Sequence, residues 1–167
     1  MKINSLDFSV AILAGISCIG FVIGLPIWAL FIGWAWYFTL GATKAGFKEA
    51  TPPMLAGSLL AVLAIVLIDV FAGFMPFLGA MMLSVLITVF LLMLTLKIPG
   101  FGCSLASFNA YSCMFAGYYA GTFPTQEQYA MGLVYAVIWI TGANFLGLIF
   151  GYLSVYFAGL GKKEKTA

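Results

Sequence analysis

The chain is a succession of long apolar segments joined by short connections, and this pattern constrains its fold more than any other feature. Of its 167 residues, 64% are hydrophobic and only 7% are charged. A soluble domain of this size has too little interior to hide so much apolar surface, so the surrounding solvent must be lipid. Because lipid offers the backbone no hydrogen bonds, we expect an all-α membrane protein whose apolar segments are spanning helices. The length accommodates one domain, residues 1–167, of about six crossings at roughly 20 residues each.

Proline, threonine and polar residues divide the chain into predicted spans. Pro26 and Pro99 impose sharp turns, and Thr51 before a proline is typical of a helix start, which leaves the polar segment 41–51 as a loop. The last apolar segment is longer than one crossing requires, so we expect it to be tilted, to overhang the bilayer, or to break near 142–144. The six predicted spans are 6–25, 26–41, 52–71, 77–96, 99–121 and 129–157.

Lysine positions predict the orientation in the membrane. The apolar run 8–25 is longer than the core of a signal peptide and another apolar segment follows it, so we expect it to be retained as the first span. Six spans place both termini on one side, and every lysine then falls on that side. Lysine marks the cytoplasmic side, so both termini are predicted to be cytoplasmic and the charged tail 161–167 to be loose. The seven lysines are Lys2, Lys44, Lys48, Lys97, Lys162, Lys163 and Lys165.

The two halves of the chain, about 6–71 and 77–158, resemble each other at an offset near 75. In each half, a long apolar helix ends at a proline turn, a second helix ends in a glycine-bearing segment, and a third helix follows. Three spans is an odd number, so the halves would enter the membrane in opposite directions, as a 3+3 inverted repeat with a solute path at their interface. The alternative is two apolar hairpins that are alike by chance. The matched pairs are Gly57 with Gly132, Ala61 with Ala136, and Asp69 with Asn144.

Two stretches of sequence carry a family resemblance. The pattern FIGWAWYFTLGATKAGFKEA at 31–50 is followed, two spans later, by KIPGFGCSLASFNAYSCMFAG at 97–117. Together they resemble the bacterial inner-membrane proteins of domain-of-unknown-function family 1097. The resemblance implies a small multi-pass protein of the bacterial inner membrane. It implies no substrate and transfers no functional residue.

The stretch 99–121 is predicted to be the innermost helix. It is apolar enough to cross a bilayer, yet it carries hydroxyl and amide side chains that need partners at membrane depth. Helical spacing separates them into two stripes, of which we expect one to line a pore and the other to bond neighbouring helices. Small residues at three- and four-residue steps also favour close helix contact. The polar residues are Ser104, Ser107, Asn109, Tyr111 and Ser112, and the candidates for pore lining or solute binding are Ser107, Asn109 and Tyr111.

Four residues outside this stretch are further candidates for pore lining or solute binding. Asp69 is the acid that lies well inside a predicted span, where an ionised carboxylate costs about 2.5–3.5 kcal/mol. Asp69 is a cation or proton site, an acceptor for a solute N–H group, or a headgroup-level residue at the end of its span. Asn144 is its match in the other half. Trp36 and Phe38 belong either to an interfacial aromatic belt or to a flat slot that selects small planar solutes.

Several classes of function are excluded by what the sequence lacks. It has no histidine and no arginine, which removes the usual general base, the usual metal ligand and the bidentate anion clamp. No HExxH, CxxC or phosphate-loop motif is present, so we expect no enzyme and no cofactor or metal, short of a hydrolase built on serine or aspartate alone. The cysteines lie in apolar segments and are expected to be packing residues. A net charge of +2 is too small to indicate nucleic acid as a partner.

These observations predict a channel or passive facilitator for a small neutral or weakly polar solute, of the urea, amide, ammonia or small-acid class. Passive permeation is favoured because Asp69 alone is available to couple transport to an ion gradient. The small-residue stripes favour a homo-oligomer in the lipid bilayer. The alternative function is a non-transporting membrane scaffold or partner-binding subunit, against which the short loops argue.

Overall fold

The computed structural model describes residues 3–163, with side chains described for residues 3–160, and all of its regular elements are helical. The helices are α1 (Ser5–Ser17), continued by a 3-10 segment (Cys18–Ile23), α2 (Ile27–Thr39), α3 (Lys44–Ala72), α4 (Phe77–Thr95), α5 (Ser104–Tyr119), α6 (Tyr129–Ala136), a π-helical segment (Val137–Thr141) and α7 (Gly142–Lys163). Four helical stretches are long and apolar enough to cross a membrane, namely Ser5–Ile23, Lys44–Ala72, Phe77–Thr95 and Tyr129–Leu160. The prediction of an all-α membrane protein is confirmed.

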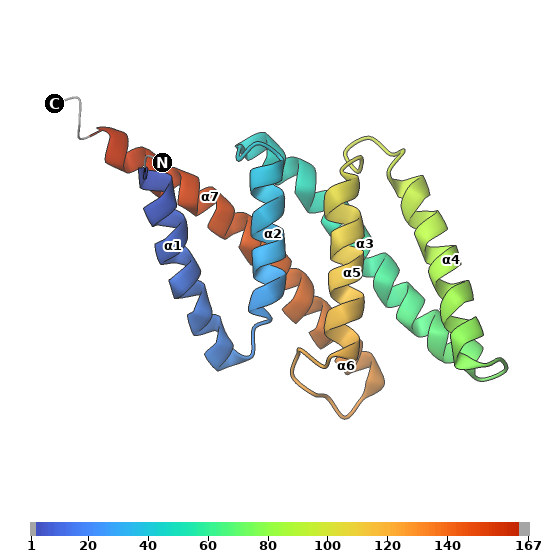
Figure 1. The fold of residues 1–167 in the computed structure, drawn as a ribbon. Coiled ribbons are helices and arrows are strands. Elements are labelled where there is room, and N and C mark those ends of the chain that lie inside the picture. The colour runs from blue at the N-terminus through green and yellow to red at the C-terminus, as the bar shows by residue number, and fades with distance from the viewer. Residues whose placement is uncertain (1–2, 164–167) are drawn as a thin grey trace.

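The helices form two layers. Figure 1 shows α1, α2, α5 and α4 side by side and nearly upright, while α3 and α7 run obliquely behind them. Along the sequence, the chain runs in opposite directions in successive helices, from α1 through α2, α3, α4 and α5 to α7. The start of α1 and the end of α7 therefore lie at the same end of the molecule, the upper one in Figure 1. The oblique helix α7 packs on α1 and α2, and α3 packs on α4 and α5. The outer helices α1 and α4 therefore leave most of their apolar side chains exposed.

Local sequence explains where the first helix begins and ends. The Asn4 side chain accepts hydrogen bonds from the backbone N–H groups of Leu6 and Asp7, and the Asp7 carboxylate accepts one from the Asn4 N–H at 2.7 Å. This reciprocal cap satisfies donors that the first turn of a helix leaves free. At the other end Gly24 has φ of 73°, a left-handed conformation that favours glycine, and Pro26 prevents continuation.

The structure corrects the predicted start of the third span. We expected a loop over 41–51 and a cap at Thr51, but α3 begins at Lys44 and its cap is Thr43, whose side chain accepts from the Gly46 N–H at 3.1 Å. Thr51 lies inside the helix, where its hydroxyl donates to the Phe47 carbonyl at 2.8 Å. Pro52 is therefore an interior proline rather than a first-turn residue. The prediction was wrong because it took the threonine before Pro52 as the helix start, whereas the helix continues through both prolines.

The sixth apolar segment continues through the region where a break was one of the expectations. Tyr129–Leu160 has 32 residues, about 48 Å of helix, against a hydrocarbon thickness of about 30 Å. Its irregularity is the π-helical segment Val137–Thr141, which ends directly before the predicted break point at 142–144. Figure 1 shows α7 running obliquely. Of the tail predicted to be loose, α7 includes residues up to Lys163, and 164–167 lie outside the described residues.

Glycines bring the oblique helices into backbone contact with the upright ones. A Cβ atom added to Gly33 on α2 would lie 2.0 Å from the Asn144 carbonyl oxygen on α7, and one on Gly147 would lie 2.0 Å from the Leu30 carbonyl oxygen. At the other crossing, a Cβ on Gly57 of α3 would lie 2.1 Å from the Ser107 carbonyl oxygen of α5. Small residues permit such contact in membranes, where packing drives helix association.

The crossing of α2 and α7 predicts the effect of adding one methyl group. Gly147→Ala should lower the free energy of unfolding by about 1–3 kcal/mol, because the new Cβ cannot fit without separating the helices. Gly132→Ala is the control, since Gly132 has no atom within 4 Å of its added Cβ. Reversible unfolding in mixed detergent micelles would measure both variants. Equal stability of the two variants would contradict the close crossing.

Candidate functional site

Polar atoms without partners occur along the inner helices. Eight buried side-chain nitrogen or oxygen atoms have no hydrogen-bond partner among the described residues. Seven of the eight belong to α2, α3, α5, α7 or the π-helical segment, and the other is on α4. A protein interior normally satisfies such groups, so a concentration of them marks a candidate site. The residues are Trp34, Trp36, Ser58, Ser84, Ser107, Trp139, Thr141 and Asn144.

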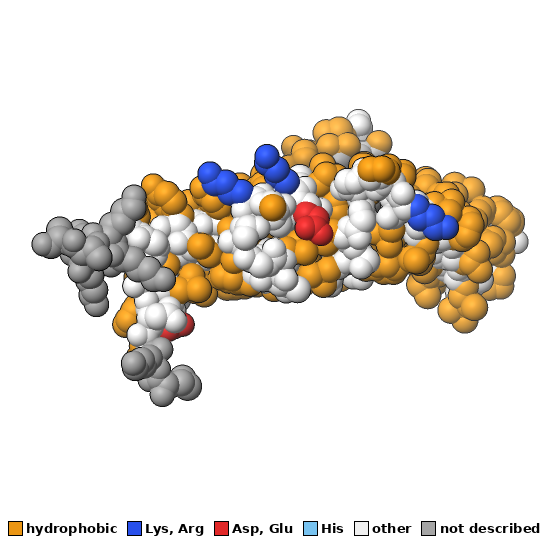
Figure 2. Space-filling model, turned by 90° about the horizontal axis from the view of Figure 1, so that it is seen from above, with side chains coloured by type: hydrophobic (Ala, Val, Ile, Leu, Met, Phe, Trp, Pro, Cys, Tyr) orange, Lys and Arg blue, Asp and Glu red, His pale blue; other side chains and the backbone are white. Residues whose placement is uncertain are grey.

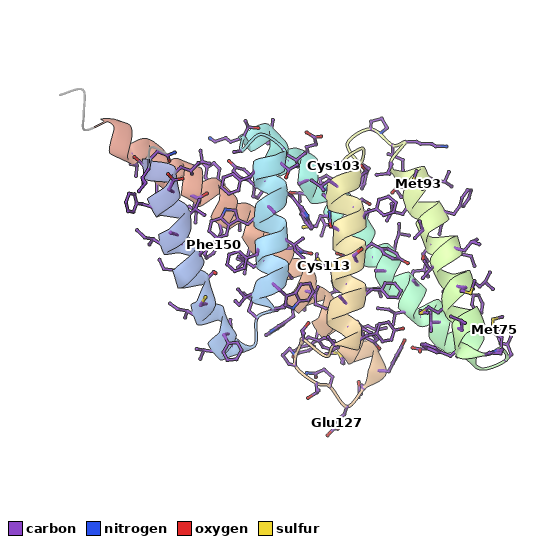
Figure 3. The ribbon with its side chains drawn as sticks, in the orientation of Figure 1. Met75, Met93, Cys103, Cys113, Glu127 and Phe150 are labelled. Atoms are coloured by element: carbon purple, nitrogen blue, oxygen red, sulfur yellow. The ribbon has the colours of Figure 1, made fainter. Side chains whose placement is uncertain are left out.

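Asn144 lies where α7 meets α2 and α5. Its side chain is fully buried, and Nδ2 donates to the Ala29 carbonyl oxygen at 2.7 Å and contacts Cys113 Sγ at 3.6 Å. Figure 3 labels Cys113 near the middle of α5. Asn144 Oδ1 has no partner. Among the residues predicted for the site, Asn144 therefore holds three helices together and presents a free acceptor between them.

The hydroxyl groups of Ser58 and Ser107 lie at the crossing of α3 and α5. Ser107 is fully buried and its backbone carbonyl abuts Gly57, while Ser58 follows Gly57 and is 1% exposed. Neither hydroxyl has a partner among the described residues. Sequence reasoning identified Ser107 and missed Ser58, although its place beside a glycine in an apolar span was an available signal.

The other polar residues predicted on α5 have partners. Tyr111 shares a 2.8 Å hydrogen bond with Thr88 of α4, and its ring stacks on Phe115 with the ring centroids 5.2 Å apart. Asn109 Nδ2 donates to the Leu105 carbonyl of its own helix at 2.8 Å. Ser112 is exposed and likewise bonds its own helix, and Ser104 is also exposed. Of the predicted polar residues of α5, Ser107 thus has an unpaired hydroxyl in the interior, and Tyr111 forms a hydrogen bond to another helix. The remaining ones are bonded within α5 or exposed.

The aromatic candidates of α2 differ from each other. Trp36 is 2% exposed and packs with Met54, Cys103 and Leu148, with no partner for its indole N–H. This burial keeps the Trp36 ring away from the lipid-facing surface on which a belt residue lies. Phe38 is half-buried and meets the edge of Tyr37 at a centroid distance of 6.1 Å.

Asp69 and Asn144 occupy unlike places, although the sequence matched them. Asp69 is exposed near the end of α3 and accepts a 2.5 Å hydrogen bond from the Tyr129 hydroxyl, whereas Asn144 is fully buried. Gly57 and Gly132, another matched pair, also differ, because only Gly57 touches a neighbouring backbone. The third matched pair, Ala61 and Ala136, does agree in burial, since both are fully buried, so the offset of 75 aligns one of the three pairs in its packing.

The π-helical segment supplies polar groups that sequence reasoning missed. Trp139 Nε1 and Thr141 Oγ1 are buried without partners, and Ile140 packs against Gly117 of α5. Short π-helical segments occur frequently at functional sites because they redirect side chains within an otherwise regular helix. The adjacent Gly142, where a break was predicted, was the available signal for this place. Among the described residues, no group of three potential metal ligands lies together.

Comparison with known proteins establishes the family. The family model described as "Protein of unknown function (DUF1097)" matches residues 8–159. The chain therefore belongs to this family, which confirms the resemblance seen in the sequence. No curated protein and no solved structure matches the chain.

The bond between Thr88 and Tyr111 predicts an energetic coupling between α4 and α5. In a double-mutant cycle of Thr88→Val and Tyr111→Phe, the coupling free energy should be about 0.6–1.7 kcal/mol, as for other hydrogen bonds between membrane helices. Unfolding in mixed micelles would give the four free energies. A coupling of zero would mean that water, rather than Thr88, satisfies the Tyr111 hydroxyl.

Proposed function

We propose that this member of the DUF1097 family is a channel or passive facilitator for a small neutral or weakly polar solute across the bacterial inner membrane. The observation that carries the proposal is the set of buried, unpaired polar atoms on the inner helices. Leaving one such group without a partner costs about 1–3 kcal/mol. Water or solute between the helices would remove this cost, because both supply hydrogen bonds that the protein does not.

The unpaired groups lie at different depths. Trp36 is three residues from the end of α2, whereas Ser58, Trp139 and Asn144 lie in the interior of their spans. Donors and acceptors at successive depths are what a permeating solute needs to exchange its hydration shell. The groups are hydroxyls, indoles and an amide, none of which is ionised, and this favours neutral solutes such as urea, an amide, ammonia or an undissociated small acid.

Short central helices favour the same function. The adjacent helices α2 and α5 have 13 and 16 residues, about 20 and 24 Å of helix, which is less than the roughly 30 Å of hydrocarbon that they must cross. A helix shorter than the bilayer draws the polar boundary inward. The barrier along the seam between α2 and α5 would accordingly be thinner than the surrounding bilayer.

The packing supports the 3+3 inverted repeat. The oblique helix α7 packs on α1 and α2 as the other oblique helix, α3, packs on α4 and α5. In Figure 1, α3 and α7 slope the same way while the chain runs along them in opposite directions, as a twofold axis in the membrane plane requires. Gly57 and Gly147 each meet the backbone of an upright helix and make a better matched pair than Gly57 and Gly132. In such a repeat, the third helix of each half packs on the first two helices of the other half.

Charge supports the proposed orientation. Lys44 and Lys48 begin α3 and Lys97 follows α4, all at the end of the molecule from which Figure 2 is seen, where blue side chains are visible. Asp69 and Glu127 belong to the opposite end, and Figure 3 labels Glu127 there. The lysine-bearing end would face the cytoplasm, together with both termini.

Permeability of proteoliposomes tests the function. Stopped-flow measurements should show faster entry of at least one solute among urea, acetamide, ammonia and acetic acid than into protein-free liposomes. Asn144→Leu should abolish most of this gain, because it removes the free acceptor at the junction of three helices. Asn109→Leu is the control, since Asn109 bonds its own helix.

Two results would contradict the proposal. If folded wild-type protein accelerates none of the solutes, the alternative of a membrane scaffold or partner-binding subunit would be favoured. If both asparagine variants reduce permeation equally, the path does not pass Asn144.

If permeation is passive, replacing Asp69 should not change how solute flux depends on pH. Because Asp69 is exposed at the end of α3 and accepts a hydrogen bond from the Tyr129 hydroxyl, Asp69→Asn should leave solute flux unchanged at every pH tested. The same stopped-flow assay at stepped pH would measure it. Flux that depends on pH in the wild type and not in the variant would indicate proton coupling instead.

A further inference from the structure

A pocket outside the proposed path lies at the lysine-bearing end of the molecule. It has a volume of about 250 Å³ and is lined by Lys44, Phe47, Lys48 and Tyr152. Three of these residues come from the first turns of α3, and Tyr152 comes from α7. The pocket therefore lies between the two oblique helices, one from each half of the chain.

Two lysines line this pocket, and because its exposed surface is almost wholly apolar, they line it with their alkyl stems. Lys44 and Lys48 are both exposed and are four residues apart, so they lie one above the other on the same side of α3. Like charges in this arrangement repel, and an anion between them relieves the repulsion. The N-terminal end of α3 adds positive potential from its free N–H groups. No ion pair to either lysine occurs among the described side chains, and Glu49, which follows Lys48, does not line the pocket.

The remaining lining is aromatic. Phe47 meets Phe145 of α7 edge to face, with the ring centroids 5.6 Å apart, and Tyr152 stacks on Tyr156 at 6.3 Å. Both Phe47 and Tyr152 are half-buried, so each keeps an accessible face. A pocket with an apolar lining and two lysines beside it fits an amphiphile better than a free inorganic anion, because the anion would leave the apolar surface uncovered.

The position of the two lysines identifies the source of the amphiphile. Lys44 and Lys48 lie at the start of α3, and a lysine side chain is costly within the hydrocarbon of a membrane. We therefore expect Lys44 and Lys48 to reach the level of the lipid phosphates, with Phe47 and Tyr152 at the edge of the acyl region. Basic pockets between membrane helices at this level bind anionic lipid headgroups.

We propose that this pocket binds one anionic phospholipid of the surrounding leaflet. Lys44 and Lys48 contact the phosphate, and Phe47 and Tyr152 contact the first carbons of an acyl chain. A lipid held there bridges α3 and α7 and stabilises the contact between the halves of the chain. The proposal does not depend on whether the protein conducts a solute.

Native mass spectrometry of the full chain, released from micelles doped with phosphatidylglycerol or phosphatidylcholine, tests the proposal. The wild type should retain phosphatidylglycerol in preference to phosphatidylcholine. Lys44→Gln and Lys48→Gln should each weaken retention of phosphatidylglycerol about fivefold, which corresponds to about 1 kcal/mol per lysine near a lipid surface. Phe47→Ala should weaken retention of both lipids, because it removes apolar contact from either one.

Lys97→Gln is the control, because Lys97 is an exposed lysine at the same end that does not line the pocket. Circular dichroism would verify that each variant is folded. Equal retention of the two lipids by the wild type, or an equal loss with Lys97→Gln, would overturn the proposal. Displacement of phosphatidylglycerol by millimolar inorganic phosphate alone would overturn it too, since the site would then recognise a free anion.

Discussion

The close crossing of an oblique helix over an upright one is the contact on which the structure depends. At Gly33, Gly57 and Gly147 the backbones of two helices touch, and no side chain larger than hydrogen fits between them. In lipid, apolar side chains gain little by leaving one hydrocarbon surface for another, so close packing and hydrogen bonds between helices hold them together. The glycine crossings supply the packing, and Asn144 adds a hydrogen bond from α7 to α2 beside one of them.

This packing also explains why polar groups remain unsatisfied at the centre. Helices that touch through their backbones fix the positions of neighbouring side chains, so the Ser58 and Ser107 hydroxyls and Asn144 Oδ1 are held near the crossings without partners. In the proposed function, those groups are the positions at which water or solute completes the hydrogen bonding. The same oblique helices form, at their lysine-bearing end, the pocket assigned to an anionic lipid.

Composition and proline positions were sufficient to predict the helical membrane fold and most helix boundaries, because lipid leaves a long apolar segment few alternatives. The start of α3 was mispredicted, since Thr43 and Thr51 are both competent caps and only tertiary packing decides between them. Ser107 and Asn144 were identified because a polar residue in an apolar helix is conspicuous. Ser58 and Thr141 were missed because a hydroxyl can bond its own helix, and the sequence does not tell which hydroxyls do so.

The central claim is that the polar atoms at the helix crossings are hydrated when the protein is in a bilayer. A crystal structure grown from a lipid mesophase, at a resolution that shows ordered water, would test it most directly. The account predicts water or solute within hydrogen-bond distance of Asn144 Oδ1 and of the Ser107 hydroxyl. A dry interior, with these atoms bonded to neighbouring backbone groups, would contradict the claim and the permeation that rests on it.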